Sequence, residues 1–228
     1  MNLSAPPPRP APSKPRRDND LYPTPLPVCR AIVRELVELS ILENGSTVVE
    51  PHVGTGNMVL ALDQVAAEAG HRYHVSVHDI SSSAPGLRLG RELVHLRVRV
   101  LPAGDWLTQG EKHGEWDLGL GNPPFAEVEE GKVRGRVVAI DHVEATRRLC
   151  RWTCFVLRDG LWTSSADSAR MAWATTQLPH YRLDLAPRPS YTGDEKRGQF
   201  GTCAAIWGPN RAPVWTQHRT IDCTRRGA

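Results

Sequence analysis

Apolar residues recur along the chain in two alternating patterns, one helical and one extended. Helical spacing, three and four residues apart, predicts helices over 27–42, 58–69, 139–150 and 166–177. Short apolar or alternating runs predict seven strands, at 46–50, 73–79, 96–100, 116–120, 153–157, 181–186 and 202–207. The pattern fades at both ends of the chain.

Strands and helices alternate through most of this pattern, which predicts an α/β fold with a doubly wound, mostly parallel seven-stranded sheet. Only a loop separates 181–186 from 202–207, so these two strands are expected to pair antiparallel and to close the sheet. Ligands of such sheets bind outside the carboxyl ends of the strands, where the strand order reverses. Residues that directly follow strands are therefore the candidates for a functional site.

The two ends of the chain differ in composition from the middle. Residues 1–20 are mostly proline, charged and small residues, which cannot bury enough apolar surface to order, so we expect a disordered basic tail. Residues 211–228 are expected to form an irregular basic tail. Between them, 21–210 is long enough for one domain with its own core.

Bulk properties restrict the function only loosely. The net charge of +3 and the pI near 8.7 permit a nucleic-acid partner without requiring one. Five cysteines without a CxxC pair predict no zinc site and a reduced, cytoplasmic environment. No apolar run approaches the roughly 18 residues of a membrane span, so no membrane association is expected.

The sequence EPHVGTGN, residues 50–57, places an acid and two glycines between a strand and a helix. Glycines let the backbone approach a ligand, and a helix N-terminus attracts negative charge. Val59 replaces the third glycine of a dinucleotide motif, so the loop alone identifies no nucleotide site. Asp79 and Asp105 follow the next two strands, where carboxylates can accept from ribose hydroxyls and an adenine amino group, and Trp106 can lie against a base. The alternative is that these acids only cap loops.

The sequence GNPPF, residues 121–125, follows the fourth predicted strand. Its two prolines fix the backbone and remove two N–H donors. The side-chain oxygen of Asn122 and the carbonyl of Pro123 can then accept both hydrogens of an incoming amine, with no N–H on Pro124 to compete. Phe125 offers a face for a planar ring. We predict a rigid two-acceptor clamp, the alternative being a proline-rich turn that caps an edge strand.

Taken in order, these motifs resemble the class I S-adenosylmethionine (SAM)-dependent methyltransferases that modify the N6 amine of adenine, with the amino-terminal motif order of phage and bacterial members. YPTP (22–25), the glycine loop, HDI (78–80), GDW (104–106) and NPPF (122–125) carry the resemblance over about residues 21 to 208. It implies a Rossmann-like methyltransferase fold, SAM as cofactor and DNA as substrate. It also implies cofactor contacts by Tyr22, Thr24, Pro25, Glu50, Gly54, Gly56, Asn57, Asp79, Ile80, Asp105, Trp106 and Asn122, and catalysis by Asn122, Pro123, Pro124 and Phe125.

Three features on the target side have weaker support. RPSYTG, residues 188–193, resembles a downstream motif of the family, so Tyr191 could pack on the target base and Arg188 could meet a phosphate, beside Phe125. The charged stretch 127–136 could form a flap over the target or a plain loop. His52 departs from the small or aromatic residue common in the glycine loop and is expected only to line it.

Three alternatives to DNA methylation stay open. The same asparagine–proline–proline clamp serves methylation of a protein glutamine amide, although the YPTP segment favours adenine. Small enzymes with an NPPF motif and a similar YPT segment act on structured RNA, and no target-recognition domain is evident in this chain. A scaffold that binds SAM or nucleic acid without catalysis would have had no need of an intact clamp.

Overall fold

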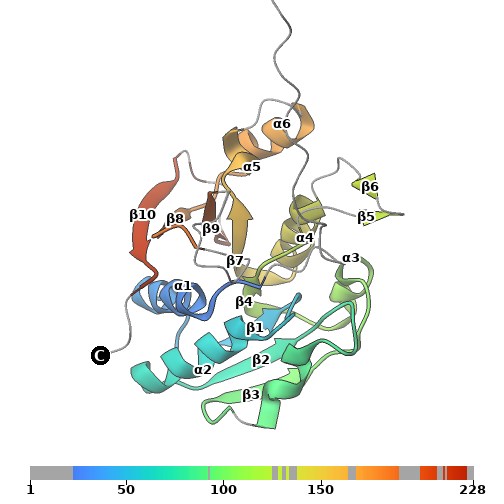
Figure 1. Cartoon of the computed structure of the whole chain (residues 1–228), viewed down its shortest axis with the longest axis vertical. Helices are drawn as coiled ribbons and strands as arrows, with labels where there is room; N and C mark the ends of the chain where they lie inside the picture. Colours follow the sequence, from blue (N-terminus) through green and yellow to red (C-terminus); the bar gives the residue numbers. More distant parts are fainter. Residues whose placement is uncertain are drawn as a thin grey trace, which may run out of the picture.

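A computed structural model describes residues 23–91, 93–124, 128–129, 132–133, 138–163, 168–189, 201–209, 213 and 215–224. One eight-stranded sheet runs through this part of the chain, in the order β10-β8-β9-β7-β4-β1-β2-β3 (Figure 1). Its strands are β1 (Thr47–Glu50), β2 (Tyr73–Val77), β3 (Leu96–Val100), β4 (Trp116–Gly121), β7 (Cys150–Arg158), β8 (Tyr181–Ala186), β9 (Thr202–Trp207) and β10 (Gln217–Asp222). A separate hairpin consists of β5 (Val128–Glu129) and β6 (Lys132–Val133).

The strand pairing confirms the predicted doubly wound sheet. All neighbouring strands are parallel except β9, which is antiparallel to both β7 and β8. The chain builds β1, β2 and β3 outward in one direction and then returns to place β4 on the other side of β1. This reversal makes the carboxyl ends of β1 and β4 the expected position of a ligand site.

Helices cover both faces of the sheet. They are α1 (Leu26–Glu38), α2 (Asn57–Ala69), α3 (Trp106–Gln109), α4 (Val138–Arg147), α5 (Gly160–Thr163) and α6 (Ser168–Thr176), with 3-10 turns η2 (Pro85–Arg91) and η3 (Gly110–Lys112). Because side chains alternate along a strand, Cys154 and Val156 of β7 pack in the cluster that holds α1 and α2, whereas Phe155 and Leu157 pack with α4.

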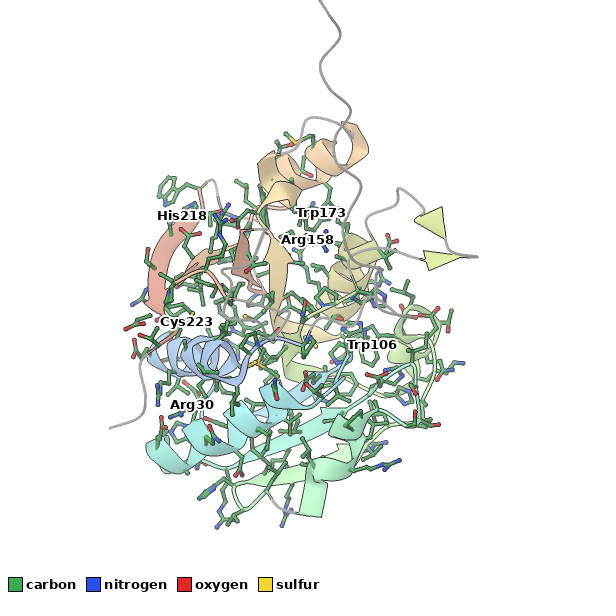
Figure 2. All side chains as sticks on the ribbon, in the orientation of Figure 1. Arg30, Trp106, Arg158, Trp173, His218 and Cys223 are labelled. Carbon is green, nitrogen blue, oxygen red and sulfur yellow. The ribbon has the colours of Figure 1, made fainter. Side chains whose placement is uncertain are left out.

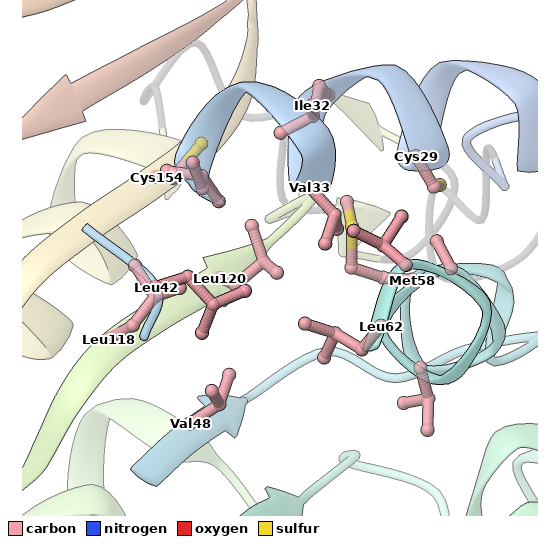
Figure 3. Close-up of a cluster of buried hydrophobic side chains, with 14 of the residues drawn as sticks. Cys29, Ile32, Val33, Leu42, Val48, Met58, Leu62, Leu118, Leu120 and Cys154 are labelled. Carbon is pink, nitrogen blue, oxygen red and sulfur yellow. The ribbon is translucent and has the colours of Figure 1, made fainter. Parts of the chain in front are cut away.

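The larger hydrophobic cluster joins α1 and α2 to the sheet. Ile32 and Val33 from α1 and Met58 and Leu62 from α2 are buried over Val48 of β1 (Figure 3). These positions follow the three-and-four spacing from which the helices were predicted. Among the described helices, none combines the length and the apolar character needed to cross a membrane.

The strand β10 corrects the prediction of an irregular tail over 211–228, and it extends the sheet beyond the predicted domain end at 210. It pairs in parallel with β8 along its whole length. Only Ile221 is buried among its six residues, so the sequence QHRTID carries no alternating signal. Arg219 binds the largely buried Glu35 of α1 at 2.8 Å, which ties this edge strand to the helix layer.

Candidate functional site

A cleft of about 600 Å³ opens at the carboxyl ends of the central strands, where the strand order reverses. This volume lies within the range of small-molecule sites. Its walls come from the N-terminal segment, the glycine loop and the ends of β2, β3 and β4, together with α4. Of the predicted site residues, it is lined by Thr24, Glu50, Gly54, Asn57, Asp79, Ile80, Asp105, Trp106, Asn122, Pro123 and Pro124.

The remaining predicted residues lie elsewhere. Pro25 is the N-cap of α1, Gly56 of the glycine loop is the N-cap of α2, and neither lines the cleft. Arg188 is exposed and is likewise not part of the cleft wall. Tyr22, Phe125 and Tyr191 lie outside the described residues, as does most of the predicted flap apart from the β5–β6 hairpin.

The glycine loop needs its glycines for backbone shape and space. Gly54 and Gly56 have φ angles of +49° and +85°, in the left-handed region that other residues avoid. A Cβ on Gly56 would overlap the Leu89 side chain and lie 2.9 Å from the Gly86 Cα of η2. The Gly86 N–H also donates to the Gly54 carbonyl at 2.9 Å. The loop therefore rests directly on η2 and turns into α2 at Asn57.

The end of β2 holds the glycine loop against the cleft. The Gly54 N–H donates to Asp79 Oδ2 at 2.9 Å, and the Ser81 N–H donates to Asp79 Oδ1 at 3.0 Å. His78 bonds Pro51 O through its Nδ1 at 3.1 Å, so that nitrogen carries the proton. Asp79 thus caps the loop, as expected if these acids served as loop caps, and it lines the cleft as well.

Glu50 is a buried carboxylate at the end of β1. Its Oε2 is shielded from solvent and has no hydrogen-bond partner among the described residues. Burial raises the pKa of Glu50 well above its usual range, and the Asp79 carboxylate raises it further. A buried acid without a partner is unfavourable until a cation neutralises it, so this position suits a positively charged ligand group.

The N-terminal segment is fixed to the glycine loop. The Asn57 side chain donates from Nδ2 to the Thr24 carbonyl at 2.9 Å, and Thr24 is buried. Pro23 and Thr24 both line the cleft. Pro23 and Thr24 therefore form one wall with the glycine loop, although they lie far from it in the sequence.

Asp105 and Trp106 follow β3 in a short turn of helix. Asp105 Oδ1 accepts from the Leu107 N–H at 3.0 Å and so caps α3. The side chain of Trp106 (Figure 2) is only 2% exposed, and its Nε1–H donates to Thr146 Oγ1 at 2.9 Å. Its ring packs among Trp116 and other core residues. Trp106 therefore contributes to the cleft wall with only a small part of its surface.

The predicted clamp lies at the end of β4. Asn122 is half-buried, Pro123 is buried, and both line the cleft. A Cβ on the preceding Gly121 would lie 3.8 Å from Glu50 Cγ and 3.9 Å from His52 Nδ1. The clamp is thus placed beside the acid of β1 and the histidine of the glycine loop.

Histidines form a further part of the cleft, in which His52 has the lining position expected of it and His142 was not predicted. His52, His78 and His142 all line it. His52 Nε2 and His142 Nδ1 lie 2.8 Å apart, and burial lowers the pKa of His142 to about 4 and that of His52 well below its usual range. Within the described ranges no group of three or more His, Cys, Asp or Glu side chains is arranged to hold a metal ion.

Comparisons with known proteins identify the fold. The sequence matches no family model and no curated protein. Among solved structures, a class I SAM-dependent methyltransferase from Listeria monocytogenes has a TM-score of 0.66 at 15% identity and is matched over 90% of this chain and 67% of its own.

Two type I restriction–modification proteins share the fold as well. A methyltransferase subunit from Streptococcus thermophilus gives a TM-score of 0.63 at 14% identity over 88% of this chain. A modification subunit from Vibrio vulnificus gives 0.58 at 14% over 89%. This chain spans 47% of the length of each subunit. The chain therefore has the Rossmann-like fold of class I SAM-dependent methyltransferases, in one sheet with an added edge strand.

Proposed function

We propose that this protein transfers the methyl group of SAM to the exocyclic N6 amine of adenine in DNA. The observation that carries this proposal is the position of Asn122 and Pro123, which lie at the strand reversal in the same cleft as Glu50 and Asp79. The same cleft would then hold both the clamp for the amine and the carboxylates for the cationic donor.

The described residues fit SAM as the methyl donor. Bound SAM supplies an electrophilic methyl group on a sulfonium, and it carries an ammonium group too. The buried Glu50 carboxylate, with Oε2 unpartnered among the described residues, would hold this positive end in the cleft that Thr24 also lines. Asp79 retains acceptor capacity on both oxygens for the ribose hydroxyls. Asp105, which also lines the cleft, would accept from the adenine amino group.

The clamp addresses the weak nucleophilicity of the target. The lone pair of an exocyclic aromatic amine is delocalised into the ring, so the nitrogen is planar and reacts poorly. Acceptance of its two hydrogens by Asn122 Oδ1 and the Pro123 carbonyl would draw the nitrogen toward a tetrahedral shape. Because Pro124 has no N–H, nothing on its backbone competes for the adjacent carbonyl. Preorganised groups of this kind stabilise the transition state by about 3 kcal/mol each.

A duplex target requires the base to leave the stack before it can enter the cleft, which costs a few kcal/mol. Phe125, Tyr191 and Arg188 remain the predicted contacts to the displaced base and its backbone. DNA is placed before RNA because the motif set resembles that of adenine-N6 DNA methyltransferases, and two structures with this fold are restriction–modification subunits.

The test is transfer of labelled methyl from SAM by the purified protein. Duplex DNA, single-stranded DNA, structured RNA and a glutamine-containing protein extract are offered in parallel, and the products are digested and identified by mass spectrometry. We expect N6-methyladenine in DNA. Label in RNA alone or in a glutamine amide alone would contradict the substrate, and SAM binding without any product would favour the scaffold.

A further inference from the structure

The pair formed by His52 and His142 lies beside the clamp. His52 belongs to the loop after β1, and His142 lies on α4 one turn after Val138, which also lines the cleft. The two rings meet edge to face with centroids 4.5 Å apart, and His52 Nε2 is 2.8 Å from His142 Nδ1. One proton must lie between these nitrogens, because two neutral acceptors would repel each other.

The buried end of the pair determines where that proton resides. His52 Nδ1 is shielded from solvent, has no hydrogen-bond partner among the described residues and lies beside Gly121. Orphaned buried N–H groups are rarer in proteins than orphaned acceptors. The favoured form therefore leaves a lone pair on His52 Nδ1 and places the proton on Nε2, which donates to His142 Nδ1.

The tautomer of His142 follows from its neutral charge and from the bond to His52. Burial keeps the pKa of His142 low, against the opposing effect of Asp105 and Asp141, and His78 lowers it further, so the ring is neutral at pH 7. A neutral ring that accepts at Nδ1 must carry its hydrogen on Nε2. His142 lines the cleft, and Nε2 is the nitrogen that His52 does not engage.

We propose that His142 is a specificity residue that donates Nε2–H to the ring acceptor beside the target amine. This inference rests on the proposed function and refines its substrate. In adenine the amine is flanked by two acceptor nitrogens, N1 and N7. Asn122 and Pro123 would accept the two hydrogens of the amine, and His142 would donate to the neighbouring ring nitrogen. Together these three groups would recognise this edge of adenine. An amine flanked only by N–H or C–H groups would leave the His142 hydrogen unpaired, which is costly in a buried site.

The test compares oligonucleotides in which the target adenine is replaced by 1-deazaadenine or by 7-deazaadenine. Each analogue keeps the amine and lacks one acceptor nitrogen. With the native protein, we expect one analogue to lower kcat/KM about tenfold or more relative to adenine. His142→Phe should lower kcat/KM for adenine and should no longer distinguish that analogue from adenine. His218→Phe, an exposed histidine on β10, is the matched control and should retain the native preference.

Two results would overturn the inference. One is equal activity of the native protein on adenine and both analogues, and the other is an unchanged preference in His142→Phe. If that variant does not fold, His142→Leu, which also lacks a side-chain donor, provides the same comparison. Loss of all methyl transfer to adenine by the native protein would instead count against the proposed function.

A measurement independent of turnover tests the tautomer. Nitrogen-15 NMR of the histidine rings in the native protein without SAM should show His142 unprotonated at Nδ1 and protonated at Nε2, with His52 in the same form. The opposite tautomer in both rings would leave no donor for the ring nitrogen and would overturn the inference.

Discussion

The two sides of the cleft differ in charge. The side built on β1, β2 and β3 is lined by the acids Glu50, Asp79 and Asp105. The side built on β4 and α4 is lined by Asn122, Pro123 and His142, the last kept uncharged by burial. A cationic donor is favoured beside carboxylates, and a charged histidine opposite it would repel it. Under the proposed function, the acids face the cationic donor and neutral polar groups face the amine.

The largest expected effect is on the neutral side. Asn122→Ala removes one acceptor of the clamp, so turnover should fall about 100- to 1,000-fold. SAM affinity should stay close to native, because the carboxylates remain. Labelled-methyl transfer and calorimetric titration with SAM measure the two quantities. Asn44→Ala, which removes a loop acceptor for the Arg72 N–H, is the control and should leave turnover unchanged.

Because the histidine pair is neutral in the fold, the protein should lose stability at acid pH. The pKa of His142 is about 4 in the folded state against 6.5 for an unperturbed histidine, so the unfolded chain binds more protons between these values. The contribution of this pKa difference to the free energy of unfolding is fully present above pH 6.5. It is lost progressively as the pH falls toward 4. The loss attributable to His142 should reach about 3 kcal/mol.

Urea unfolding of the native protein and of the double variant His52→Phe/His142→Phe, at pH 7 and pH 4, measures this loss. The variant should lose less stability than the native protein over the interval. An identical loss in both proteins would show that the pair is not neutral in the fold.

On the charged side, Asp79→Ala should weaken SAM binding about tenfold to a hundredfold, since both the ribose acceptor and the acceptor for the Gly54 N–H disappear. The matched control is Asp117→Ala. Asp117 accepts from the N–H and the hydroxyl of Thr47, both at 2.8 Å, at the opposite end of β1. That variant should lose stability and keep its SAM affinity, and equal weakening in both would place the effect in the fold.

The smallest expected effect comes from Glu50→Gln, which keeps the shape and removes the charge. Because burial raises the pKa of Glu50, the folded state without SAM holds its proton more tightly than the unfolded state, and stability falls as the pH rises above 4.5. The variant without SAM should therefore be more stable at pH 7, by about 1 kcal/mol, with a difference that shrinks toward pH 4.

The affinity of Glu50→Gln for SAM should move in the opposite direction and fall. Thermal unfolding with and without SAM measures both changes in one experiment. A variant that is less stable without SAM, or that binds SAM as well as the native protein, would contradict the assignment of Glu50 to a cation.

The sequence predicted those parts of the fold whose residues are buried in a repeating pattern. The strand at 73–77 and the helix at 57–69 have clear periodicity and form where expected, within a few residues. The strand at 217–222 pairs through its backbone with five of its six side chains exposed, so no hydrophobic pattern marks it. The short helices α3 and α5 are one turn long, too short for a periodic signal.

The site was predictable where a residue follows a strand, because topology brings strand ends together. Asp79, Asp105 and Asn122 reach the cleft for this reason. His142 comes from the middle of a helix, and only its spacing of four from Val138 would have placed it on a common face. The burial of Trp106 depends on packing against Thr146 and the core, which no local pattern reveals.

The contact between the backbones of Gly56 and Gly86 has a consequence for redesign. A Cβ on either glycine would lie 2.9 Å from the Cα of the other, so η2 supports the glycine loop through direct backbone contact. Any side chain introduced at either glycine would lift the loop and carry Asp79 with it through the Gly54 bond. Attempts to accommodate enlarged methyl-donor analogues should therefore leave this contact intact and widen the cleft at Ile80 or Leu107, which border it and are exposed.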